Sequence, residues 1–208
     1  MANKIDFKLL VITDRKKCKP KKLDDVVIEA CHSGVKAFQL REKNLSASEI
    51  LSLSLKLRKI TSNHSKLIIN DRLDIALLSK SNGIHSPENG ILPKQAKSFN
   101  KNLIIGKSAH SLKSAIEAER KGYDYIIFGP VFRTQSKVKY GKPKGIKELT
   151  RICAKIKIPV FAVGGINPDR AKKCIEAGAQ GAAVIGAVMK SRNVKKTITE
   201  FKENMGSL

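Results

Sequence analysis

The chain has 208 residues, of which 41% are hydrophobic and 5% aromatic, so it is long enough for one domain with an aliphatic core. No apolar run approaches the ~20 residues that a membrane-spanning helix needs, and the apolar stretch before Asp14 is too short for a signal peptide. We therefore expect a cytoplasmic protein. The formal net charge of +23 calls for anionic partners, but the lysines are scattered and no nucleic-acid-binding motif accompanies them. The sequence therefore does not favour nucleic acid as a partner, and anionic small substrates explain the charge at least as well.

Strand-like runs alternate with helical segments along the whole chain. The strand-like runs cover residues 9–13, 37–40, 67–70, 83–85, 103–106, 125–129, 160–163 and 182–185. Helical spacing is found at residues 23–33, from about 46, at 72–78, 93–99, 111–121 and 146–155, between the last two strands, and at 194–204. Ser46 and Glu49 have the spacing of a capping box at the start of the second helix.

This alternation gives eight strand–helix units of roughly 26 residues each, within the range of compact βα repeats. Strands that are nearly continuous runs of apolar residues favour a parallel sheet covered by helices on one side, and eight units favour closure into a barrel. The glycine fingerprint of dinucleotide-binding folds is absent after the first strand. The sequence predicts a single-domain (β/α)8 TIM barrel over residues 1–208. Whether it forms a homo-oligomer is left open.

In such a barrel the chemistry lies at the carboxyl ends of the strands. The second strand ends in Gln39, Arg41 and Lys43, which strand alternation would direct the same way. These donors suit a phosphate or pyrophosphate; a solvated charged loop is the alternative.

The next strand ends offer further polar groups. Asp71, after Asn70, is either a Mg²⁺ ligand or the N-cap of the following helix. His85 ends the fourth strand and is either structural or catalytic. At the fifth strand, Ser108 and Lys107 could both serve an anion, and His110 is a candidate helix cap.

Two stretches suggest phosphate binding later in the chain. Thr134, Ser136 and Lys137 lie on a long loop that is either a lid over a phosphate or an ordinary solvated loop. The seventh and eighth strands end in Gly164-Gly165 and Gly186-Ala187, where TIM barrels commonly build a phosphate site. Tight turns are the alternative for these glycines.

Seven motifs, in this order and spacing, resemble thiamine phosphate synthase and the related TenI-type thiazole tautomerases. They are FQLREK, LIINDR, GIH, GKSAHS, DYIIFGPVF, PVFAVGGI and AGAQGAAVI, and the resemblance covers residues 12 to about 188. It implies the Mg²⁺-assisted coupling of a hydroxymethylpyrimidine pyrophosphate with a hydroxyethylthiazole phosphate, which yields thiamine phosphate and pyrophosphate.

The resemblance also implies roles for individual residues. Gln39, Arg41 and Lys43 would hold pyrophosphate beside Asn70, Asp71 would bind Mg²⁺, and Ser108 would assist the leaving group. Arg41, Lys43, Ser108 and Lys137 would be the catalytic set. Thr134, Ser136 and Lys137 would close over the site. Gly165 with the backbone at Ile185 and Gly186 would hold the thiazole phosphate.

Four positions depart from the family pattern, among them Ser136, where the family more often has Thr. The synthase's second Mg²⁺-binding Asp falls on Gly90, and its usual Ser falls on Gly186. Some tautomerases have a catalytic His at the position of Pro130, so that His is missing here. The sequence around Lys107, in contrast, is closer to that of the tautomerases. The synthase is the favoured interpretation; a thiazole tautomerase or another thiazole-phosphate-binding protein is the alternative.

Overall fold

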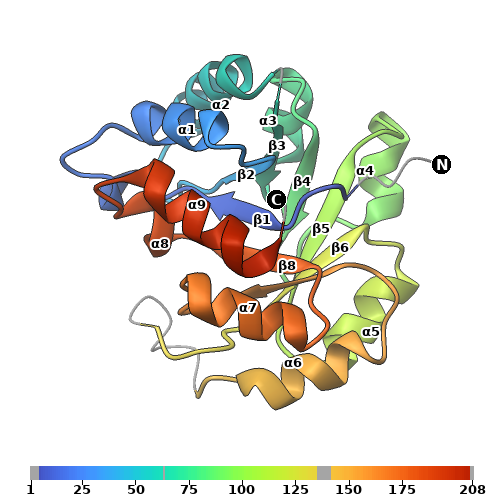
Figure 1. The fold of residues 1–208 in the computed structure, drawn as a ribbon. Coiled ribbons are helices and arrows are strands. Elements are labelled where there is room, and N and C mark those ends of the chain that lie inside the picture. Colours follow the sequence, from blue (N-terminus) through green and yellow to red (C-terminus); the bar gives the residue numbers. More distant parts are fainter. Residues whose placement is uncertain (1–4, 63, 135–141, 207–208) are drawn as a thin grey trace.

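The computed structural model describes residues 5–62, 64–134 and 142–206 (Figure 1). Its parallel strands form a closed barrel in which each strand pairs with the next and β8 pairs with β1. The strands are β1 (Leu9–Ile12), β2 (Ala37–Leu40), β3 (Lys66–Asn70), β4 (Gly83–Ser86), β5 (Ile104–Ala109), β6 (Tyr125–Phe128), β7 (Val160–Val163) and β8 (Gly181–Val184). The predicted (β/α)8 barrel is confirmed.

Helices surround the strands on the outside (Figure 1). They are α1 (Leu23–His32), α2 (Ala47–Thr61), α3 (Leu73–Leu78), α4 (Pro93–Phe99), α5 (Leu112–Arg120), α6 (Gly145–Cys153), α7 (Pro168–Glu176), α8 (Gly186–Met189) and α9 (Val194–Met205), with a 3-10 turn η1 (Arg15–Lys17) after β1. No described helix is both long and apolar enough to cross a membrane.

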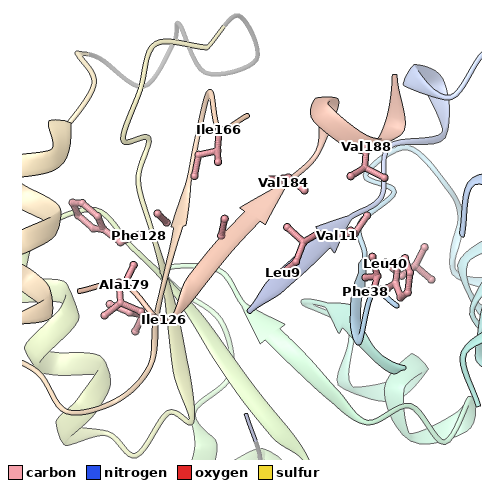
Figure 2. Packing of buried hydrophobic residues seen from close by; sticks show 14 of the residues in the cluster. Leu9, Val11, Phe38, Leu40, Ile126, Phe128, Ile166, Ala179, Val184 and Val188 are labelled. Carbon is pink, nitrogen blue, oxygen red and sulfur yellow. The ribbon is translucent and has the colours of Figure 1, made fainter. Parts of the chain in front are cut away.

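Alternation along each strand divides the apolar side chains into two layers. Leu9, Val11, Phe38 and Leu40 point outward and pack between the strands and the helices (Figure 2). The intervening residues point inward and fill the barrel, among them Leu10, Ile12, Ile68, Ile127 and Ala183. Both faces of the strands are therefore largely buried, which is why most strand residues are apolar.

One end of the barrel is closed by aromatic packing. Phe7, just before β1, stacks on Phe161 with ring centroids 5.1 Å apart and meets the edge of Tyr125 at 6.3 Å. Because Phe7 precedes the first strand, this plug lies at the amino-terminal ends of the strands. In the described part of the chain, this packing leaves the opposite end, where the strands terminate, as the place for ligands.

Two differences from the sequence prediction affect the site. Strand β5 continues through Ala109 instead of ending at Gly106, so Lys107 and Ser108 lie within the strand. The four-residue helix α8 was not predicted, because it is too short to show helical periodicity.

The capping box at the start of α2 is confirmed: Ser46 N–H donates to Glu49 Oε2 at 2.7 Å, and Glu49 N–H donates to Ser46 Oγ at 3.4 Å.

Candidate active site

Gln39 and Asn70 meet at the open end of the barrel, from the neighbouring strands β2 and β3. Gln39 Nε2 donates to Asn70 Oδ1 at 3.0 Å. Gln39 is only 1% exposed, and among the described residues its Oε1 has no hydrogen-bond partner. A buried amide oxygen without a partner costs free energy, so this position indicates a place for a ligand.

Two cations follow Gln39 at the rim. Strand β2 ends at Leu40, so strand alternation sets the direction of the Gln39 side chain but not that of Lys43. Lys43 lies in an exposed turn. The half-buried Arg41 is fixed through its backbone, whose N–H donates to Thr13 Oγ1 at 3.0 Å. Within the described residues neither cation forms an ion pair with an acidic group. Both charges are thus available to an anion.

Glu42, between them, is buried and anchors the segment. It is 6% exposed; its Oε1 accepts from Arg15 N–H at 3.0 Å, and its Oε2 lies 3.9 Å from Arg15 Nε. Burial raises the pKa of the Glu42 carboxyl, although the Arg15 backbone donor opposes the shift. This contact joins the loops after β1 and β2.

Asp71 leaves β3 in a left-handed conformation with φ of +64°. Its backbone N–H donates to His85 O at 3.0 Å, and its side chain is exposed. The N-cap of α3 is Arg72, so the alternative interpretation of Asp71 as the cap is wrong. Such a conformation is a local strain of about 1 kcal/mol that commonly accompanies function.

Ser108 and Lys107 lie on opposite faces of β5. Ser108 Oγ is 3.0 Å from His85 Nε2, and His85 Nδ1 is 3.3 Å from Tyr125 Oη. Lys107 instead lies outside the barrel, where Nζ donates to Glu88 O at 2.6 Å and sits 5.1 Å from the Tyr123 ring centroid. Desolvation lowers the pKa of Lys107. The expectation that Lys107 and Ser108 serve one anion is therefore wrong, because successive strand residues face opposite ways.

His110 does not cap α5. The cap is Ser111, whose Oγ accepts from Ser114 N–H at 3.2 Å, while His110 Nδ1 donates to Gly129 O at 2.6 Å. His110 therefore ties the end of β5 to the end of β6.

A cavity with a volume of about 130 Å³ lies at the ends of β7 and β8. Its lining includes Thr134, Gly164, Gly165, Ile185 and Gly186. Gly164 and Gly165 have φ of +101° and +63°, and a Cβ on Gly165 would lie 2.5 Å from Arg133 O. Only glycine allows this approach of the chain. Helix α8 begins at Gly186, which matches the short extra helix of TIM-barrel phosphate sites.

Sequence reasoning missed Arg170, which supports this cavity from α7. Arg170 Nη1 donates to Gly165 O at 2.6 Å, and its guanidinium lies 5.0 Å from the Phe132 ring centroid. Ser136 and Lys137, predicted for the same loop as Thr134, lie outside the described residues.

The loop after β4 has no room for the family's second Asp at Gly90. Gly90 N–H donates to Pro87 O at 3.0 Å, and a Cβ on Gly90 would lie 2.7 Å from Pro87 Cδ. Across the described parts of the chain, no three His, Cys, Asp or Glu side chains gather as a metal site. A Mg²⁺ ion at Asp71 would thus take its other ligands from substrate oxygens and water, a set that Mg²⁺ accepts.

Comparison with known proteins agrees with this geometry. The sequence model described as thiamine monophosphate synthase matches residues 9–188. The thiamine-phosphate synthase of Clostridium acetobutylicum is 40% identical, with 92% of this chain and 91% of that protein covered. The solved structure of thiamine phosphate pyrophosphorylase from Pyrococcus furiosus is 38% identical and superimposes with a TM-score of 0.86, covering 98% of this chain and 96% of that one. The chain therefore belongs to the thiamine monophosphate synthase family.

Proposed function

We propose that this chain is a thiamine-phosphate synthase, a transferase that joins a hydroxymethylpyrimidine pyrophosphate to a hydroxyethylthiazole phosphate. The observation that supports the proposal is that two groups of residues suited to binding anions lie at the same end of the barrel. One is the β2–β3 end with Gln39, Asn70, Arg41 and Lys43; the other is the β7–β8 cavity. Two phosphorylated substrates need two such subsites.

The pyrophosphate subsite uses donors and fixed positive charge. Arg41 and Lys43 would bind the pyrophosphate oxygens, and the Gln39–Asn70 pair would offer amide hydrogens. Ser108 would donate its hydroxyl to the leaving oxygen. As the C–O bond breaks, its electron pair goes to pyrophosphate and a pyrimidinylmethyl cation remains. Groups that stabilise the negative charge on pyrophosphate lower the barrier.

Magnesium fits the donor set of this subsite. Asp71 would hold the ion, and substrate oxygens and water would complete its ligand set. When bound, Mg²⁺ neutralises charge on the pyrophosphate and so makes it a better leaving group.

The thiazole phosphate would bind at Gly165, Ile185 and Gly186, where glycine lets backbone N–H groups approach an anion. Its ring nitrogen then attacks the pyrimidinylmethyl cation, and the new C–N bond completes thiamine phosphate. Thr134, Ser136 and Lys137 would cover the site and exclude water from the cation.

The position of Lys107 argues against the tautomerase alternative. Lys107 is directed out of the barrel and bonded to Glu88 O, so it is not available to a substrate at the mouth. We further propose that residues 1–208 form one domain, and that the protein acts in the cytoplasm on these small molecules.

The test combines both substrates with Mg²⁺ and measures thiamine phosphate by chromatography. Asp71→Asn should abolish most of the activity, because it removes the metal-binding charge. Asp74→Asn is the matched control, since Asp74 is exposed nearby and paired with Arg72 at 2.5 Å. Parent protein that binds the thiazole phosphate but makes no thiamine phosphate would refute the proposal.

A further inference from the structure

A chain of three polar side chains runs through the interior of the barrel, beneath the open end. Tyr125 Oη lies 3.3 Å from His85 Nδ1, and His85 Nε2 lies 3.0 Å from Ser108 Oγ. Tyr125 is fully buried and His85 is 3% exposed, whereas Ser108 is half-buried and reaches the mouth. The chain thus connects the sealed interior to the hydroxyl at the pyrophosphate subsite.

Gly106 makes this arrangement possible. The strand register places Gly106 between His85 on β4 and Tyr125 on β6. A Cβ at Gly106 would lie 2.1 Å from Tyr125 Cζ and 2.5 Å from Tyr125 Oη. The tyrosine therefore crosses β5 through space that only glycine leaves free, and so reaches the histidine two strands away.

The protonation states of the three groups are linked. Burial strongly raises the pKa of Tyr125, so the phenol keeps its proton. A buried tyrosine hydroxyl needs a hydrogen-bond partner, and His85 Nδ1 is within reach. A phenol O–H that donates to Nδ1 requires the proton of the neutral imidazole to be on Nε2.

That tautomer determines what Ser108 can do. With hydrogen on Nε2, His85 donates to Ser108 Oγ, and the Ser108 proton is free to point toward the mouth. In the opposite tautomer Nε2 would accept the Ser108 proton, and a lone pair of Oγ would face the mouth. Only the first arrangement favours an anion there.

We propose that Tyr125 and His85 are positioning residues that hold the Ser108 hydroxyl as a donor toward the pyrophosphate leaving group. This inference rests on the proposed function for its substrate, but the His85 tautomer is a property of the protein alone. The Tyr125–His85 pair acts through Ser108 and touches no reacting atom.

The first test is long-range proton–nitrogen NMR on the full chain labelled with ¹⁵N-histidine. The His85 signals are assigned by their loss in His85→Gln. We expect the Nε2–H tautomer in the parent. Hydrogen on Nδ1 would overturn the proposal, and this reading needs neither substrate nor a variant of Tyr125.

The second test is a double-mutant cycle read by calorimetric binding of Mg²⁺–pyrophosphate. Tyr125→Phe should weaken binding about fivefold when Ser108 is present and less than about twofold in a Ser108→Ala background. Equal losses in both backgrounds would show a merely structural role. Tyr123→Phe is the matched control, because the Tyr123 hydroxyl donates to Ile91 O on the outer side of β5 and should not affect binding.

The two hypotheses fail separately. If no thiamine phosphate forms while the Nε2–H tautomer and the Ser108-dependent loss of binding are both found, the synthase is refuted and the positioning role of Tyr125 and His85 stands. Full synthase activity with the Nδ1–H tautomer would refute the positioning role alone.

Discussion

The side-chain amides of Gln39 and Asn70 are joined by one hydrogen bond of 3.0 Å, which leaves Gln39 Oε1 buried without a partner in the described structure. Amide groups can be turned about their last bond, so the pair keeps its mutual bond when both are reversed. The buried position then carries an N–H instead of an oxygen. This pair can therefore meet an anion with a donor and needs no movement of the backbone.

Gln39→Glu should weaken pyrophosphate binding by at least about tenfold, because it places a buried carboxylate beside the anion. Calorimetry with Mg²⁺–pyrophosphate measures the effect. Gln95→Glu is the control: Gln95 is exposed on α4 and accepts from Leu92 N–H at 3.1 Å, a bond that a carboxylate also makes. Equal affinities for Gln39→Glu and the parent would exclude Gln39 from the subsite.

Arg41→Ala should raise the KM for the pyrimidine pyrophosphate by about tenfold or more, because it deletes a charge-assisted contact to the leaving group. Arg41→Lys should restore part of the loss. The comparison variant is Arg151→Ala, which removes an exposed arginine 3.6 Å from Glu148 on α6. Steady-state kinetics would contradict the assignment if both alanine variants matched the parent.

Gly186→Ser should tighten binding of the thiazole phosphate by a few-fold, since it adds a hydroxyl donor at the start of α8. There is room for the side chain, because the nearest atom to an added Cβ is Lys190 Cδ at 3.9 Å. Gly165→Ser should do the opposite, because a Cβ there would lie 2.5 Å from Arg133 O. Titration of the two variants with the thiazole phosphate separates them; weaker binding in Gly186→Ser would argue against a phosphate at this helix.

Because of Glu42, the free energy of unfolding should contain a contribution that decreases as the pH rises. Burial raises the pKa of its carboxyl above the ordinary 4.5, so the folded protein binds more protons than the unfolded chain in the window above that value. The stabilising contribution is complete below the ordinary pKa and is lost as the pH rises through the raised one. Glu42→Gln should lack this decline.

Urea unfolding of the parent and Glu42→Gln from about pH 4 to 8 measures this slope. Glu49→Gln is the control, because Glu49 contributes to the pH dependence of stability in the opposite direction. The hydrogen bond from Ser46 lowers the pKa of Glu49, so its contribution is lost as the pH falls. Parallel curves for the parent and Glu42→Gln would contradict the prediction.

The fold was predictable because its signal is local. Each strand is an apolar run, each helix has its own periodicity, and the eight units follow in chain order around the barrel. The strand ends also predicted that Gln39 and Asn70 share the mouth. The family predicted from the ordered motifs is confirmed by its sequence model over residues 9–188.

The remaining features depend on register and on backbone conformation, which a single sequence does not reveal. The contact of His85 with Ser108 follows from how β4 and β5 align. The left-handed conformation of Asp71 excluded the cap that its position suggested. Lys107 and Ser108 lie on opposite faces of β5, because the strand continues through Ala109, three residues beyond the end of its apolar run at Gly106.

The most direct test of the central claim is the stoichiometry of one reaction. Parent protein with Mg²⁺, the pyrimidine pyrophosphate and the thiazole phosphate should release pyrophosphate and thiamine phosphate in equal amounts, and neither product when the thiazole phosphate is omitted. Pyrophosphate released without thiamine phosphate, or a thiazole phosphate converted in the absence of the pyrimidine, would contradict the two-subsite synthase.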